Sequence, residues 1–140
     1  MTRYLLDTNI CIEVIRQRGG RALERLRTCA VGGVGISAIT LAELMHGAEK
    51  SAWPERNRAA VYRFSAPLEI LPFDDGCATA YGRIRAGPER QGKIIGPMDL
   101  LIAAQALCVE AVLITGNERE FRRVDGLRIE NWLEAGSSTA

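Results

Sequence analysis

The sequence predicts an α/β protein whose central parallel sheet is flanked by helices on both faces. Short apolar segments alternate along the whole chain with longer stretches in which apolar residues recur at helical spacing. Glycine pairs and prolines stand where one element should give way to the next. Because 140 residues suit one compact domain, we expect a single domain over residues 1–135, followed by a disordered tail over residues 136–140.

In the first half of the chain, apolar periodicity defines the helices and glycine pairs separate the elements. A proline opens the last of these helices, because its missing N–H would lack a partner in the first turn anyway. In chain order, the expected elements are the strand Tyr4–Leu6, a helix from Thr8 to the Gly19-Gly20 pair, a helix over Arg21–Thr28, the strand Val34–Ser37, a helix over Ala38–Lys50 and a helix from Pro54 to Ser65.

In the second half, Asp74 or Asp75 can cap a helix. We expect that helix to end near Arg85, because Gly87-Pro88 interrupts it. The helix after Pro97 is almost wholly apolar, which predicts a central position against the sheet. The expected elements are the strand Leu68–Leu71, a helix from Asp75, a helix over Pro97–Glu110, the strand Val112–Thr115, a short helix from Asn117 and the strand Arg128–Glu130.

Composition narrows the classes of function only slightly. A net charge of +1 neither indicates nor excludes a nucleic-acid binder, and an aromatic content of 6% argues against a surface on which bases stack. A zinc site is not expected, because the cysteines lack a C-x-x-C spacing and His46 is the sole histidine. Cys11 and Cys108 lie in apolar helical runs and are expected to be buried thiols, which fit a reducing cytosol.

Neither a secretory signal nor a membrane segment is expected. Asp7 and Glu13 interrupt the apolar N-terminal stretch, which the core of a signal peptide would not tolerate. The apolar run Leu100–Ile114 is too short and too polar for a transmembrane helix. We therefore expect a cytoplasmic protein that does not bind membranes.

Three acidic residues stand where a catalytic site would use them. Asp7 directly follows a strand, at the edge of a parallel sheet where ligands bind, although it could equally cap the next helix. Glu43 lies at the border of a buried helix face, although Thr40 and Glu43 could form a capping box. Asp99 is the one acid at the start of the apolar helix, where the helix dipole also favours a negative charge.

Taken together, the three acids predict a metal site. Crowded carboxylates repel one another and need a cation, and Mg²⁺ or Mn²⁺ prefers oxygen ligands. Such a cation polarises a phosphodiester and lowers the pKa of a bound water, so the protein needs no nucleophile of its own. Asn117 and Glu120 follow a strand and would lie near the same crevice, where Thr115 would add a hydroxyl, although Asn117 and Glu120 are also spaced as a helix cap.

Four segments, in order along nearly the whole chain, carry a resemblance: YLLDTNICIEVI, ISAITLAELMHGAEKS, GKIIGPMDLLIAAQAL and TGNEREFRRVDGLRIENW. Together they resemble the VapC toxins, which are PIN-domain ribonucleases of bacterial toxin–antitoxin pairs. The resemblance implies a PIN fold with sheet order 3-2-1-4-5 and RNA cleavage that depends on Mg²⁺ or Mn²⁺. The GPMD segment resembles enzymes that cut initiator tRNA in the anticodon loop, so tRNA is the expected substrate.

The resemblance also implies roles for residues. Asp7 and Asp99 match direct metal ligands, and Glu43 matches a residue that binds metal or positions water. Thr115 matches a neighbouring hydroxyl, and a more variable fourth acidic position falls to Asn117 or Glu120. The expected catalytic residues are Asp7, Glu43, Asp99, Thr115, Asn117 and Glu120. The family further implies a VapB antitoxin as partner, a homodimer that joins it in a larger assembly, and contact with DNA only through the antitoxin.

Basic residues lie before the Asp99 helix and after the last catalytic strand, and we expect some of them to bind RNA phosphates. They are Arg83, Arg85, Arg90, Lys93, Arg119, Arg122 and Arg123. Three other functions compete with RNA cleavage. An inactive module that binds RNA or antitoxin would not need all three acids, a DNA nuclease would need added length to thread DNA, and phosphotransfer from Asp7 would need a second aspartate in DTN.

Overall fold

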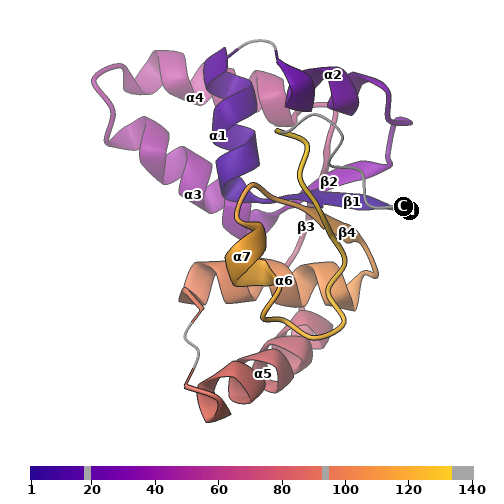
Figure 1. Ribbon diagram of the computed structural model, residues 1–140. Helices are drawn as coiled ribbons and strands as arrows, with labels where there is room; N and C mark the ends of the chain where they lie inside the picture. Colours follow the sequence, from indigo (N-terminus) through magenta and orange to yellow (C-terminus); the bar gives the residue numbers. More distant parts are fainter. Residues whose placement is uncertain (18–19, 93–94, 134–140) are drawn as a thin grey trace.

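The computed structural model describes residues 1–17, 20–92 and 95–133, and its strands form one parallel sheet of order β3-β2-β1-β4-β5 (Figure 1). This confirms the expected class and strand order.

The strands are β1 (Tyr4–Leu6), β2 (Val34–Ser37), β3 (Glu69–Leu71), β4 (Val112–Ile114) and β5 (Ile129–Glu130). The helices are α1 (Thr8–Gln17), α2 (Arg21–Arg27), α3 (Ala38–Glu49), α4 (Pro54–Ser65), α5 (Asp75–Arg90), α6 (Pro97–Cys108) and α7 (Glu118–Phe121). The expected tail, residues 136–140, lies outside the described residues.

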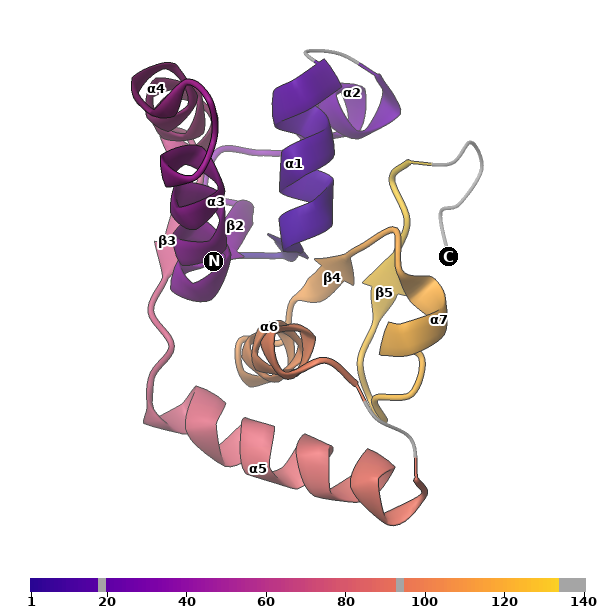
Figure 2. The same cartoon turned by 90° about the vertical axis from the view of Figure 1, so that its left-hand side faces the viewer.

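Apolar residues fill both faces of the sheet, because successive side chains of a strand point to opposite sides. Leu6 and Ile114 join the core beneath α1 to α4, whereas Leu5 and Leu113 join the core against α6 and α7. Figures 1 and 2 show these two groups of helices on opposite sides of the strands, with α5 packed outside α6. A parallel sheet covered in this way leaves its carboxyl edge as the place where polar side chains gather.

The helix α5 is longer than the sequence predicted. It continues through Gly87-Pro88 to Arg90, so the expected end near Arg85 is wrong. Pro88 lies in the last turn, where its missing N–H removes only the helical bond to Ile84, and its ring is buried. Burial of the ring compensates for the lost hydrogen bond, so the helix does not break.

The helix α6 is the most deeply buried of the described helices, as its composition predicted, and its residues Ile102 to Ala106 are at most 1% exposed. It ends at Cys108, and Glu110 then takes a left-handed backbone conformation. Cys11 is buried as expected, but the expectation for Cys108 is wrong, because the last turn of α6 presents this thiol to solvent. Within the described residues, neither α6 nor any other helix is long and apolar enough to cross a membrane.

Candidate active site

The carboxyl ends of the two central strands bring Asp7 and Thr115 together. In the β1–β4 ladder Leu6 is paired with Ile114, so the residue after each strand emerges at the same point of the edge. Asp7 is 2% exposed and Thr115 is fully buried. Burial raises the pKa of the Asp7 carboxyl, and hydrogen bonds from Thr115 and from the Ile10 N–H, at 2.8 Å, oppose that rise. Asp7 therefore both caps α1 and faces the edge of the sheet.

The second acid, Glu43, comes from α3. The Ser37 hydroxyl caps this helix by accepting a hydrogen bond from the Ile39 N–H at 3.0 Å, so the alternative capping box of Thr40 and Glu43 is wrong. Glu43 Oε1 instead accepts a 2.7 Å hydrogen bond from Thr8 Oγ1, in the first turn of α1. Because Thr8 follows Asp7, the two carboxylates are held on the same side of the sheet edge, and Glu43 contributes to the raised pKa of Asp7.

Asp99 lies in the first turn of α6, after Gly96 and the first-position Pro97. Its pKa is raised to about 6, first by burial and then by repulsion from Glu120, Asp7 and Glu43. Gly96 adjoins both Asp99 and Glu120: a Cβ added there would be in ordinary contact with the two carboxylates, 3.6 Å from Asp99 Oδ2 and 3.8 Å from Glu120 Oε1. Asp7, Glu43, Asp99 and Glu120 therefore lie near one another, although they are distributed over most of the chain.

Glu120 also lies in this cluster, and the Asn117 side chain contacts it. Glu120 Oε1 accepts a 2.9 Å hydrogen bond from the Gly96 N–H, and Oε2 accepts a 2.8 Å bond from the Asn117 side-chain amide. The backbone N–H of Asn117 donates to Thr115 Oγ1 at 2.9 Å. Asn117 stands at the N-cap position of α7, but its side chain makes no cap hydrogen bond, so the interpretation of this pair as a helix cap is wrong.

The donor set of this cluster fits a hard divalent cation. Its ligand atoms are carboxylate oxygens, which Mg²⁺ and Mn²⁺ prefer, and the mutual repulsion that raises the Asp99 pKa is what a cation would relieve. Among the described residues, a tighter group with all ligand atoms within 4.8 Å occurs elsewhere, at Asp74, Cys77 and Cys108.

The expected RNA-binding residues lie on α5 and around α7. All the described ones are exposed, whereas Lys93 lies outside the described residues. Arg85 pairs with Glu89 at 3.3 Å, and Arg122 pairs with Glu118 at 3.3 Å. Such exposed pairs are weak, so these guanidinium groups can exchange a carboxylate for a phosphate at little cost.

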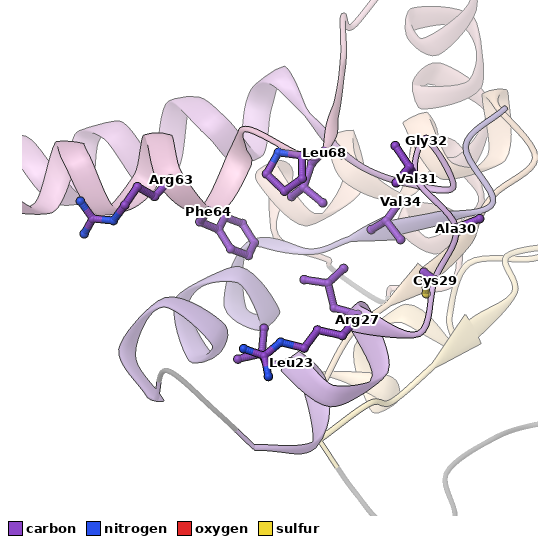
Figure 3. Close-up of a pocket in the computed structure, with 12 residues that line it drawn as sticks. Leu23, Arg27, Cys29, Ala30, Val31, Gly32, Val34, Arg63, Phe64 and Leu68 are labelled. Carbon is purple, nitrogen blue, oxygen red and sulfur yellow. The ribbon is translucent and has the colours of Figure 1, made fainter.

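The hollows among the helices α1 to α4 differ in what lines them. The pocket in Figure 3, about 360 Å³, is lined by apolar side chains such as Leu23 and Phe64 and by Arg27 and Arg63, and none of the described acidic residues lines it. A groove of about 270 Å³ between α1, α3 and α4 is also mostly apolar, but Glu43 forms part of its wall. The groove therefore leads to the acidic cluster, and the pocket in Figure 3 does not.

Comparisons with known proteins identify the family of this chain. The family model of the PIN domain matches residues 4–127. A tRNA(fMet)-specific endonuclease VapC of Shigella flexneri is 44% identical over 94% of this chain and 99% of its own length. Ribonuclease VapC2 of Haemophilus influenzae is 46% identical over 95% of this chain and its own full length. A crystal structure of DNA-bound VapBC from Salmonella typhimurium superposes with a TM-score of 0.90 at 44% identity, covering 94% of this chain and 99% of that one.

Proposed function

This chain belongs to the PIN-domain family, and from that membership and its likeness to VapC ribonucleases we propose that it is the ribonuclease toxin of a toxin–antitoxin pair. The observation that carries the proposal is the meeting of Asp7, Glu43, Asp99 and Glu120 at one sheet edge. The substrate we propose is initiator tRNA, cut in the anticodon loop. Two of the relatives are named as endonucleases specific for tRNA(fMet), which supports this choice.

We propose Mg²⁺, or Mn²⁺ in its place, as the cofactor, held by Asp7 and Asp99 with Glu43 as a further ligand or as the group that orients water. A divalent cation so held polarises a phosphodiester and makes a water molecule more acidic. The chain's own residues prepare the site: the Thr115 hydroxyl bonds to Asp7, and Asn117 and the Gly96 N–H fix Glu120. Fixed carboxylates need no rearrangement when the cation and the RNA arrive.

The competing functions account for fewer observations. An inactive binding module would not require four acids that destabilise one another in the absence of a cation. A DNA nuclease of the flap-cutting kind needs added segments to thread DNA, and the relatives matched over almost their whole length are named as ribonucleases.

We propose a VapB-type antitoxin as the protein partner, which the VapBC complexes among the structural relatives support. The apolar groove between α1, α3 and α4 suits an amphipathic antitoxin segment whose end would reach Glu43. In this proposal the toxin forms a homodimer within a larger assembly and reaches DNA only through the antitoxin. A tRNA substrate further implies that the protein acts in the cytoplasm.

Replacing Asp7 with asparagine tests the proposed function. Purified wild-type protein is expected to cut initiator tRNA only when Mg²⁺ or Mn²⁺ is added, and Asp7→Asn is expected to abolish the cut. Asparagine keeps the oxygen that accepts from the Ile10 N–H, so the fold is preserved while the charge is lost. Equal cleavage by wild type and Asp7→Asn, or cleavage in excess chelator, would refute the metal mechanism.

Replacing Thr8 with valine tests how Glu43 is positioned. The change removes the 2.7 Å hydrogen bond to Glu43, and the cleavage rate is expected to fall about tenfold, with a higher Mg²⁺ concentration at half-maximal rate. Thr8→Ser keeps the hydroxyl and serves as the control, with near wild-type behaviour expected. If valine and serine variants require the same Mg²⁺ concentration, Thr8 has no positioning role.

Neutralising the basic residues tests the proposed RNA-binding surface. Both proteins in this test carry Asp7→Asn, so that they do not cut the tRNA. Replacing all seven basic residues with glutamine is expected to weaken their binding to tRNA. It should also flatten the salt dependence, by about 0.7–0.9 in the slope of log K against log salt for each phosphate that the variant no longer binds. Arg27→Gln and Arg63→Gln, at the pocket in Figure 3, provide the control surface. The assignment is wrong if the protein with all seven replacements binds tRNA as tightly as its parent.

A further inference from the structure

A second cluster of metal-ligating side chains lies where α5 begins and α6 ends. Ligand atoms of Asp74, Cys77 and Cys108 all lie within 4.8 Å of one another. The helices α5 and α6 pack against each other, and the start of one meets the end of the other (Figures 1 and 2). Asp99 and Cys108 stand at opposite ends of α6, about 13 Å apart along the helix axis, so this cluster is separate from the acidic site.

The backbone around the cluster is fixed before any ligand binds. Asp74 Oδ1 caps α5 by accepting a 3.1 Å hydrogen bond from the Cys77 N–H. One turn before Cys108, the buried Gln105 side chain donates to the carbonyls of Leu71 and Pro72 at 3.1 and 2.9 Å. These two hydrogen bonds tie the segment that leads into α5 to the last turns of α6, so the two cysteines are presented to each other by rigid elements.

The absence of a side chain at Gly76 permits the close approach. A Cβ at this position would lie 3.0 Å from Cys108 Sγ, which is tighter than an ordinary contact, and 3.4 Å from Asp74 Oδ1. Cys77 is buried and Cys108 is exposed, so one sulfur faces the protein and the other faces solvent. The cluster is therefore open to solvent on the side of Asp74 and Cys108.

We propose that Asp74, Cys77 and Cys108 bind a thiophilic divalent cation such as Zn²⁺. Two sulfurs and one carboxylate oxygen are ligands that Zn²⁺ accepts and that Mg²⁺ does not favour. Zn–S bonds of about 2.3 Å place two sulfurs of one tetrahedral ion about 3.8 Å apart, within the observed spread. Binding releases the two thiol protons to solvent, and water completes the tetrahedron on the side of Cys108. The bound ion clamps the start of α5 to the end of α6.

Titration of the full-length protein with Co²⁺ tests the proposal. The protein is first freed of metal and reduced with a phosphine that does not bind metal, and saturating Mg²⁺ is present to occupy the acidic site. We expect one Co²⁺ per chain to produce thiolate-to-cobalt charge-transfer absorption, which Zn²⁺ then removes by displacement. An ion bound at the acidic site has oxygen ligands only and gives no such absorption.

Three variants locate the site. Cys108→Ser, at an exposed position, is expected to lower Co²⁺ and Zn²⁺ affinity at least about tenfold and to reduce the charge-transfer absorption. Asp74→Asn is expected to lower affinity while keeping the cap of α5, and Cys29→Ser, a cysteine outside the cluster, is the matched control without effect. Wild-type protein without charge-transfer absorption, absorption unchanged in Cys108→Ser, or loss of binding in Cys29→Ser would each overturn the proposal.

Discussion

Replacing Asp99 with asparagine is expected to abolish RNA cleavage and at the same time to stabilise the metal-free protein. The loss of rate should be at least about a thousandfold, or about 4 kcal/mol of transition-state stabilisation, because Asp99 is a proposed metal ligand. The gain in stability arises because the wild-type carboxyl must ionise where it is half-buried, and beside Glu120, Asp7 and Glu43. Cleavage assays and urea unfolding in chelator measure the two effects.

The stability effect has a defined dependence on pH. The folded pKa of Asp99, about 6, lies above the value of about 3.9 for an unfolded aspartate. A raised pKa favours the fold while the carboxyl is protonated, so this contribution is complete below pH 4 and is lost as pH rises through 6. The full shift corresponds to about 3 kcal/mol, and solvent screening of this half-buried group reduces the expected loss to about 1 kcal/mol.

The Asp99→Asn variant should therefore lose less stability than wild type between pH 4 and pH 7 when metal is absent. Added Mg²⁺ should restore wild-type stability at pH 7 and should have little effect on the variant. Parallel stability curves for the two proteins over this pH range would contradict the account, as would full cleavage activity in the variant.

Replacing Gly35 with alanine is expected to destabilise the protein by about 2–4 kcal/mol. Gly35 lies in β2 between β1 and β3, paired with Leu5 and Glu69. An added Cβ would come within 2.9 Å of the Glu69 carbonyl oxygen, which is backbone held in the sheet, and 3.2 Å from the methyl group of Thr2. Rotation of a side chain cannot relieve the clash with the Glu69 carbonyl oxygen, because that atom belongs to the backbone. Moving β2 away from β3 would break the hydrogen bonds between these two strands.

The matched control for this prediction is Gly47→Ala. Gly47 lies in α3, and a Cβ there would meet no atom within 4 Å. Alanine in a helix is up to about 1 kcal/mol more favourable than glycine, so this variant should be slightly more stable than wild type. Urea unfolding of the three proteins gives the comparison, and equal stability of both variants would show that the close approach at Gly35 has no energetic cost.

The strand ends of the sheet could be predicted from the sequence because the alternation of short apolar runs and helices is regular. Once β1 and β4 are placed side by side, Asp7 and Thr115 must meet, since each follows its strand directly. Asp99 was recognisable as the one acid at the tip of an apolar helix. Neither inference required side-chain detail.

Two features could not be predicted in this way because each depends on contacts between distant segments. The sequence pattern allowed Asn117 and Glu120 to form a helix cap, whereas in the structure Glu120 is bonded to the distant Gly96 N–H as well as to Asn117. Cys77 and Cys108 gave no metal-site spacing, since two helices bring them together.

The continuation of α5 past Gly87-Pro88 is a case in which burial outweighed a local preference. The proline ring is buried, and the one hydrogen bond it removes is near the end of the helix. A prediction from local propensity has no access to this compensation.

The central claim, that four distant carboxylates form one divalent-cation site, is tested most directly by anomalous diffraction from crystals of this protein soaked in Mn²⁺. We predict one strong manganese peak among Asp7, Glu43, Asp99 and Glu120, and its disappearance from crystals of Asp7→Asn. A wild-type crystal with no peak at this edge of the sheet, under conditions in which the protein cuts RNA with Mn²⁺, would contradict the account.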